Sequence, residues 1–449
     1  MPEAFRRSLI LVGFVLLCSF GALSAAWQVR NWGDALSPVD AYSEANAIRE
    51  VRNFLDTGIT ANDGLGNVLR PGLYPDQGFA GDPAGRAAYL TPSGVYTHYP
   101  PGPEYLLYVA MRVLGPQPIS HLRVLPLVVC WAAALYLGWS LRKRFGAPVA
   151  WLVMLACAAL PMFSDADSFL HYDGYALALL LIEIAVSVGC NGLIVPFALL
   201  GFVQGWLSFD YAFIVALAPG SIELALARMG IGHVARPRLA VWRCIAAGGG
   251  FALAHLLHLA EVAAFYGSFH TALLDLRRAA AIRSGASAGD GLLQRVGMTF
   301  EVLKHYLVGE YPISTVFWRP DAGLPGNWHV FRFMGLTLGI WWLVLTSGFI
   351  IGKRLRHAPP RAGRAIDEDW LVVSVCSLVP CLLWYIVMLN HSIVHVHFLY
   401  RHLFLCFFLF VLFCATALAK ELSHVTVRSR AVFAGPLALI SSLPRRTAL

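Results

Sequence analysis

Long apolar runs constrain this chain more than any other feature of its sequence. Several stretches of about 17–26 residues carry almost no charge, and a helix of that length crosses a hydrocarbon core of about 30 Å. Only 13% of the residues are charged, about half the roughly 25% of a soluble domain. Backbone polar groups in lipid must be satisfied internally, which favours helices. We therefore predict an all-α polytopic membrane protein with about ten transmembrane helices.

Basic residues between the apolar runs predict the orientation, because Lys and Arg in short loops stay on the inner side. Clusters near residues 6–7, 142–144, 228–243, 353–364 and 420–430 fall on one side for a single set of spans. These spans are 8–26, 121–141, 147–163, 174–190, 193–208, 211–228, 240–265, 331–351, 370–390 and 399–419. The same clusters account for the net charge of +8 through topology and anionic headgroups, so nucleic acid is not an expected partner.

The whole chain, 1–449, is predicted to be one membrane domain with two large outer segments. The first outer segment, 27–120, contains a polar helical stretch near 40–56. It ends in Tyr99-Pro-Pro-Gly-Pro103, which is typical of a turn leading into an amphipathic interfacial helix. The second, 266–330, contains amphipathic pieces at 271–283 and 291–308.

The N-terminal apolar stretch and the cysteines each allow two interpretations. The small residues Ala22–Ala26 suit signal-peptide cleavage. However, the basic clusters all fall on one side of the membrane only if the stretch is an uncleaved first span. The nine cysteines include no CxxC pair, and several lie inside apolar runs. We interpret them as small buried side chains rather than disulfides or zinc ligands.

Unusual polar residues collect on the outer side of this topology. Asp40, shortly after the first span, suits a general base that takes a proton from an acceptor hydroxyl. Asp165 and Asp167 share one turn, a spacing that suits a hard cation with oxygen ligands. These carboxylates permit a divalent cation without requiring one. Arg401, at the head of the last span, suits bidentate recognition of a phosphate.

These features together resemble the GT-C membrane glycosyltransferases, a group that includes protein O-mannosyltransferases and lipid A aminoarabinose transferases. Such proteins take a sugar from a polyprenyl-phosphate or diphosphate carrier on the outer face. The resemblance rests on an acid after the first span (Asp40, with Glu44 nearby) and on the Tyr99–Pro103 segment before an interfacial helix. It also rests on the acidic pair Asp165 and Asp167 and on a late outer turn rich in His and Arg.

The resemblance implies that Asp40 is the catalytic base and that Asp165 or Asp167 supports the acceptor or a metal. The chain departs from the O-mannosyltransferases, because Val39-Asp40-Ala41 stands where they have an Asp-Glu pair, and no soluble C-terminal domain is expected. A lipid or glycan acceptor is therefore favoured over a protein. We assign the donor phosphate to Arg401, His397, Arg277 and Arg278, and the acceptor pocket to Glu44, His98, Tyr99, His171 and Asp173.

Ordinary structural roles stand beside each of these assignments. Asp40 could simply cap a helix that begins near Ala41. Glu261, late in the seventh span, is a functional candidate by its depth, although it could pair with His258 or Arg277. Solvated turn or helix positions would equally explain Asp165, Asp167, Asp173, Arg277 and Arg278, and interfacial polar positions would explain His395 and His397.

Three other functions compete with a glycosyltransferase of the bacterial inner membrane that acts at the outer face. A transporter or flippase would show paired, interrupted spans and charges near mid-membrane, whereas the charges here prefer the outer rim. An O-antigen ligase or polymerase usually carries its large loop late in the chain. A non-catalytic assembly factor is the third alternative. The enzyme hypothesis requires that Asp40, the 164–173 turn and Arg401 converge.

Overall fold

The computed structural model describes residues 41–69, 77–158, 169–189, 193–229, 236–285, 291–308, 366–394 and 400–416, and the single residues 12, 15, 36, 163 and 419. The described residues form helices joined by turns. Their only β pairing consists of two isolated bridges, Asn67–Val95 and Leu90–Tyr96. The all-helical class predicted from the sequence is therefore confirmed for this part of the chain.

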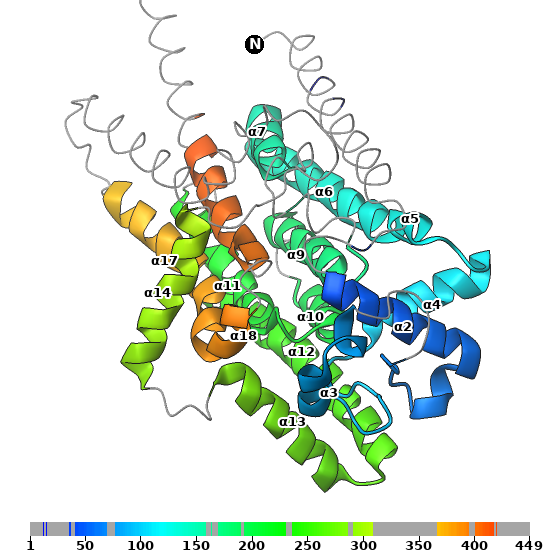
Figure 1. Cartoon of the computed structure of the whole chain (residues 1–449). Helices are drawn as coiled ribbons and strands as arrows, with labels where there is room; N and C mark the ends of the chain where they lie inside the picture. Colours follow the sequence, from blue (N-terminus) through cyan, green and yellow to red (C-terminus); the bar gives the residue numbers. More distant parts are fainter. Residues whose placement is uncertain are drawn as a thin grey trace, which may run out of the picture.

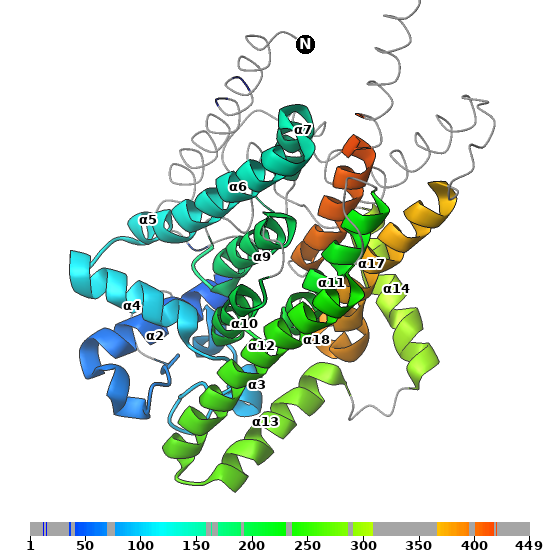
Figure 2. The ribbon, with the colours of Figure 1, turned by 180° about the vertical axis from the view of Figure 1, so that it is seen from behind.

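The helices divide into an apolar bundle and a polar end. The bundle contains α6 (Val124–Phe145), α7 (Ala147–Ala158), α9 (Tyr172–Gly189), α10 (Val195–Leu207), α11 (Ala212–Arg228), α12 (Pro237–Tyr266), α17 (Ile366–Val387) and the helix Arg401–Thr416. The remaining helices are α2 (Ala41–Thr57), α3 (Pro83–Tyr89), α4 (Gly102–Leu114), α5 (Ile119–Leu122), α13 (Phe269–Ser284), α14 (Leu292–Val308) and α18 (Leu389–Val394). Short 3-10 turns are η1 (Ile59–Asn62), η2 (Gly78–Ala80) and η5 (Tyr400–Leu403). Opposite views place α7 at one end and α3 and α13 at the other (Figure 1, Figure 2).

Helices lie at eight of the ten predicted span positions. Within the described ranges, three helical stretches are long and apolar enough to cross a membrane: Ile119–Phe145, Tyr172–Gly189 and Pro237–Tyr266. The predicted spans 8–26 and 331–351 lie outside the described residues, apart from Val12 and Val15. The polar and amphipathic helices predicted near 40–56, 105–113, 271–283 and 291–308 are present as α2, α4, α13 and α14.

Glycines allow α10 and α12 to pack with their backbones in contact. A Cβ atom on Gly201 would lie 2.0 Å from the carbonyl oxygen of Ala247, and one on Gly250 would lie 2.0 Å from that of Ala198. Gly201 and Gly205 form a Gly-x-x-x-Gly pair, the spacing that brings small residues to one helix face. The close approach holds α10 directly against α12.

Replacing Gly250 by alanine should destabilise the protein by about 1–3 kcal/mol, because the added methyl group meets backbone that cannot move aside. Gly249→Ala is the matched control, since a Cβ there has no heavy atom within 4 Å. The control should leave stability unchanged or raise it by about 0.5–1 kcal/mol. Thermal unfolding of both detergent-solubilised variants tests this, and equal midpoints would rule out the close contact.

The turn after α12 starts the segment that covers the polar end. Gly267 ends α12 in the left-handed conformation, at φ 62°, and Ser268 caps α13 by accepting from the backbone N–H of Thr271 at 3.2 Å. The other end of α13 is tied to α18, because the Asn390 amide donates to the carbonyl of Ile282 at 2.8 Å. These two attachments hold both ends of α13 in place.

Candidate functional site

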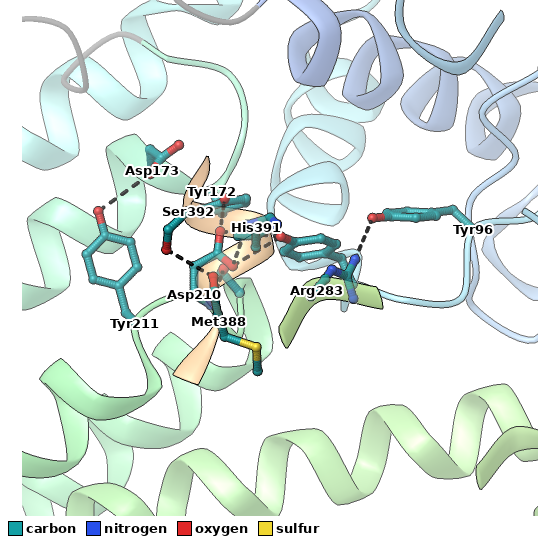
Figure 3. Close-up of polar contacts among 11 residues, drawn as sticks. Tyr96, Tyr172, Asp173, Asp210, Tyr211, Arg283, Met388, His391 and Ser392 are labelled. Carbon is teal, nitrogen blue, oxygen red and sulfur yellow. Dashed lines mark hydrogen bonds and ion pairs between the residues drawn. The ribbon is translucent and has the colours of Figure 1, made fainter. Parts of the chain in front are cut away.

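Asp210 lies at the centre of a buried polar network at this end of the bundle. It sits in the connection between α10 and α11 and is 0% exposed. The Tyr99 hydroxyl donates to its Oδ1 at 3.1 Å, and the Tyr172 hydroxyl donates to its Oδ2. His391 Nε2 lies 3.5 Å from Oδ1 (Figure 3). Four separate stretches of the chain therefore meet at one carboxylate.

The surroundings of Asp210 keep it ionised. Burial alone would raise its pKa, but the charge and hydrogen bond of His391 and the hydrogen bond from Tyr172 outweigh burial. The pKa of Asp210 is therefore lowered from its ordinary value. A carboxylate that is this well stabilised is a poor proton acceptor, so Asp210 orients its neighbours rather than serving as a general base.

Asp173 and Arg401 form a buried ion pair near Asp210. The Arg401 Nη1 lies 2.6 Å from the Asp173 Oδ2, and both side chains are almost fully buried. The guanidinium also lies over the Phe169 ring, with its carbon 4.9 Å from the centroid. Tyr211 donates to Asp173 Oδ1 at 3.5 Å. The end of the 164–173 turn and the last outer turn, both predicted to belong to the site, are therefore in contact.

Two histidines of the late turn, His391 and His402, pack around Trp384 of α17. His391 and His402 have ring centroids 5.9 Å and 5.5 Å from the Trp384 ring. His402 is also 4.7 Å from the Tyr211 ring. The aromatic packing holds α18 and η5 against the start of α11, beside Asp210. His171, a predicted pocket residue, is half-buried and lies 4.2 Å from the Tyr172 ring.

Glu44 links the start of α2 to this network. Both of its carboxylate oxygens accept from Arg123, at 2.6 Å and 2.8 Å, and Oε1 also accepts from the backbone N–H of Leu170 at 3.2 Å. These three donors occupy the carboxylate that we had assigned to the acceptor pocket. Glu44 therefore fixes the beginning of α2 against the segment that leads into Asp173.

His98, also assigned to the pocket, is anchored to α13. Its Nε2 lies 3.2 Å from Asp275 Oδ1, and Thr97 donates to the same carboxylate at 2.6 Å. Burial lowers the pKa of His98 although Asp275 opposes the shift, so the imidazole is held neutral near pH 7. Of the two partners considered for Glu261, the structure shows His258, with 3.3 Å between Oε2 and Nδ1.

Arg283 approaches the network from the last turn of α13. Its side chain is buried, and its Nη2 donates to the Tyr96 hydroxyl at 3.2 Å (Figure 3). The guanidinium carbon lies 4.8 Å from the Tyr99 ring centroid and 4.5 Å from that of Phe209. Arg277 and Arg278, which the sequence suggested for the donor phosphate, are exposed on α13, and Arg278 donates to the carbonyl of Ala87 at 3.4 Å.

Several predicted site residues lie outside the described part of the chain: Asp40, Asp165, Asp167, His395 and His397. Among the residues that the structure describes, no group of three or more His, Cys, Asp or Glu could hold a metal ion. In the sequence, Asp210 is only a single acid between two predicted spans, with no pattern that marks it as a site residue. Nothing in the sequence separated Arg283 from the neighbouring exposed arginines, because its burial depends on aromatic rings from distant segments.

A pair of buried acids lies nearby, between α2 and α4. Burial raises the pKa of Glu104 from 4.5 to about 7, although a bond from its own backbone N–H opposes the shift. Burial also raises the pKa of Glu50, and the charge of Glu104 raises it further. The folded protein therefore holds protons here that the unfolded chain releases at lower pH.

This pair predicts that stability falls as the pH rises. The raised pKa of Glu104 favours the folded state fully below pH 4.5, and this contribution, on the order of 3 kcal/mol, is lost as the pH approaches 7. In Glu104→Gln the thermal midpoint should fall less between about pH 5 and pH 8 than in the wild type. Glu301→Gln, at an exposed position, should follow the wild-type curve. Parallel curves for wild type and Glu104→Gln would contradict the shift.

Comparisons with known proteins identify no relative. No family model matches the chain, and neither the curated proteins nor the solved structures contain a match.

Proposed function

We propose that this chain is an integral membrane glycosyltransferase that transfers a sugar from a polyprenyl-phosphate carrier to a lipid or glycan acceptor. The reaction would take place on the outer face of a bacterial inner membrane. The supporting observation is the gathering of buried charged and hydroxyl side chains at one end of an apolar bundle, around Asp210 and the Asp173–Arg401 pair. Burying each charge costs several kcal/mol, so retained clusters of this kind are candidates for function.

Such a transfer requires little chemistry from the protein. The carrier phosphate is the leaving group and stays in the membrane, while the acceptor approaches from water. The protein aligns the two, removes a proton from the acceptor hydroxyl and stabilises the charge on the leaving group. In this proposal Asp40 is the base, and Asp165 or Asp167 supports the acceptor or a divalent cation. Asp210, which is ionised and accepts hydrogen bonds from two tyrosine hydroxyls, holds the residues around the site in place.

The contacts of Glu44 support this role for Asp40. The helix α2 begins at Ala41, directly after Asp40. Glu44 accepts a hydrogen bond from Leu170, three residues before Asp173, at 3.2 Å. The start of α2 and the end of the 164–173 turn are therefore neighbours, which supports the proposal that Asp40 acts beside this turn.

A transporter or flippase for lipid-linked sugars is the second candidate, and charges inside the bundle favour it. Glu183 lies within the apolar helix α9 and is 2% exposed, and its Oε1 has no hydrogen-bond partner among the residues that the structure describes. Glu223 and Arg243 form an ion pair at 3.3 Å between α11 and α12. Ionisable groups inside spans often mark a transport path.

One experiment separates the two candidates. Purified full-length protein is incubated with a panel of radiolabelled polyprenyl-phosphate sugars and extracted envelope lipids and glycans, with and without a chelator. A transferase moves the label out of the carrier fraction and leaves polyprenyl phosphate behind, and loss of transfer with chelator would establish a metal requirement. In proteoliposomes, movement of the intact donor across the bilayer without cleavage would instead establish the transporter.

A further inference from the structure

Arg283 differs in its partners from Arg123, Arg243 and Arg401, the three arginines with the most deeply buried side chains among the described residues. Arg123, Arg243 and Arg401 each lie within 4 Å of a carboxylate, those of Glu44, Glu223 and Asp173 respectively. Arg283 is also buried, at 6% exposure, yet no ion pair among the described residues includes it. Its one side-chain hydrogen bond in this part of the chain goes to the neutral hydroxyl of Tyr96.

The surroundings of Arg283 compensate its charge only in part. The rings of Tyr89, Tyr99 and Phe209 lie 5.6, 4.8 and 4.5 Å from the guanidinium carbon, close enough for cation–π attraction. The C-terminal end of α13 adds a weak favourable dipole. The charge of Asp210 also favours the guanidinium, but no carboxylate among the described residues lies within 4 Å of it. An arginine cannot lose its proton to escape the cost of burial. The site is therefore ready for an anion.

Arg283 is also placed beside the network rather than away from it. The Tyr99 ring lies on the guanidinium, while the Tyr99 hydroxyl donates to Asp210. Asp210 in turn already has His391 and Tyr172 as partners. An anion at Arg283 would therefore lie next to the buried acids without taking a partner from them (Figure 3).

We propose that Arg283, enclosed by these aromatic rings, binds the phosphate group of the prenyl-linked donor. The guanidinium fork matches two phosphate oxygens, and the hydroxyl of Tyr96 can donate to a third. The assignment rests on the proposed function and replaces Arg401 as the phosphate ligand, because Asp173 already neutralises Arg401. Arg401 then acts as a positioning residue that holds Asp173.

Binding without turnover tests the assignment. Full-length protein in detergent is titrated by calorimetry with farnesyl phosphate, farnesol, inorganic phosphate and phosphatidylglycerol. We expect farnesyl phosphate to bind, farnesol to bind at least tenfold more weakly, and inorganic phosphate to compete with farnesyl phosphate. Arg283→Gln should weaken farnesyl phosphate binding by about tenfold to a hundredfold, the usual effect of removing charge-assisted hydrogen bonds. Arg52→Gln, which removes the same charge at an exposed position of α2, should bind like the wild type.

Equal affinity in Arg283→Gln and wild type would overturn the assignment, as would an equal loss in Arg52→Gln. Phosphatidylglycerol that binds as tightly as farnesyl phosphate, and whose binding depends on Arg283, would assign the site to a phospholipid headgroup and overturn the donor role.

If Arg283→Gln does not fold, Arg283→Lys keeps the charge and should bind farnesyl phosphate about threefold to tenfold more weakly, because a point charge cannot reproduce the fork of the guanidinium. Unchanged affinity in that variant would equally overturn it. Loss of binding without sugar transfer by the wild type would retain the phosphate site and reject the glycosyltransferase.

Discussion

Asp173→Ala is expected to lower the free energy of unfolding by about 3–5 kcal/mol, because Arg401 would remain buried without its counter-charge. The pair is almost completely enclosed, and its closest atoms are 2.6 Å apart. Tyr211 also loses the acceptor of its hydrogen bond. Chemical or thermal denaturation in detergent, followed by the loss of helical circular dichroism, measures this decrease in stability.

The double variant Asp173→Leu with Arg401→Met is the control for this prediction. Apolar residues of similar volume remove both charges, so the double variant should recover most of the stability. A loss below about 1 kcal/mol in Asp173→Ala alone would show that the pair is solvated and would contradict its burial.

Asp40→Asn should reduce the rate of sugar transfer by about 10²–10⁴-fold, since the amide keeps the shape of the side chain but cannot accept a proton. The variant should keep the wild-type thermal midpoint, because Asn and Asp are equally favourable residues before a helix. Initial rates of label release from the polyprenyl-phosphate donor provide the measurement.

Asp63→Asn is the matched control for Asp40→Asn. Asp63 is exposed in the same outer segment and has a positive φ of 53°, which Asn tolerates. The Asp63→Asn substitution removes the same charge as Asp40→Asn, and the variant should transfer sugar at the wild-type rate. An Asp40→Asn variant whose rate stays within threefold of the wild type would remove Asp40 from the role of base.

The positions of the helices could be read from the sequence because each apolar run has the length and uniformity of a buried helix. The sequence between 174 and 228 was harder to divide. There the runs follow one another with few polar breaks, and the helices are short, with 13 residues in α10 and 17 in α11. Length alone could not have placed those boundaries.

The partners of the polar residues could not be read in the same way. Arg401 has the residue type and position of a phosphate ligand, but its charge is neutralised by Asp173, which lies more than two hundred residues earlier in the sequence. Glu44 meets Arg123 and Leu170, and Arg283 meets rings from three other segments. Such contacts depend on tertiary packing, which leaves no local pattern in a single sequence. Residue type therefore indicated which side chains were unusual, but not which of them were already neutralised.

Photocrosslinking with a donor analogue tests most directly whether the buried network is the place where the lipid-linked sugar binds. The analogue carries a photoreactive group on the isoprene unit next to the phosphate, and the crosslinked peptides are identified by mass spectrometry. We predict crosslinks within 96–104, 206–211, 280–285, 389–394 and 400–403, which surround Asp210 and Arg283, and competition by unlabelled donor. Crosslinks confined to the opposite end of the bundle, near 142–147, 228–229 and 236–243, would contradict the account.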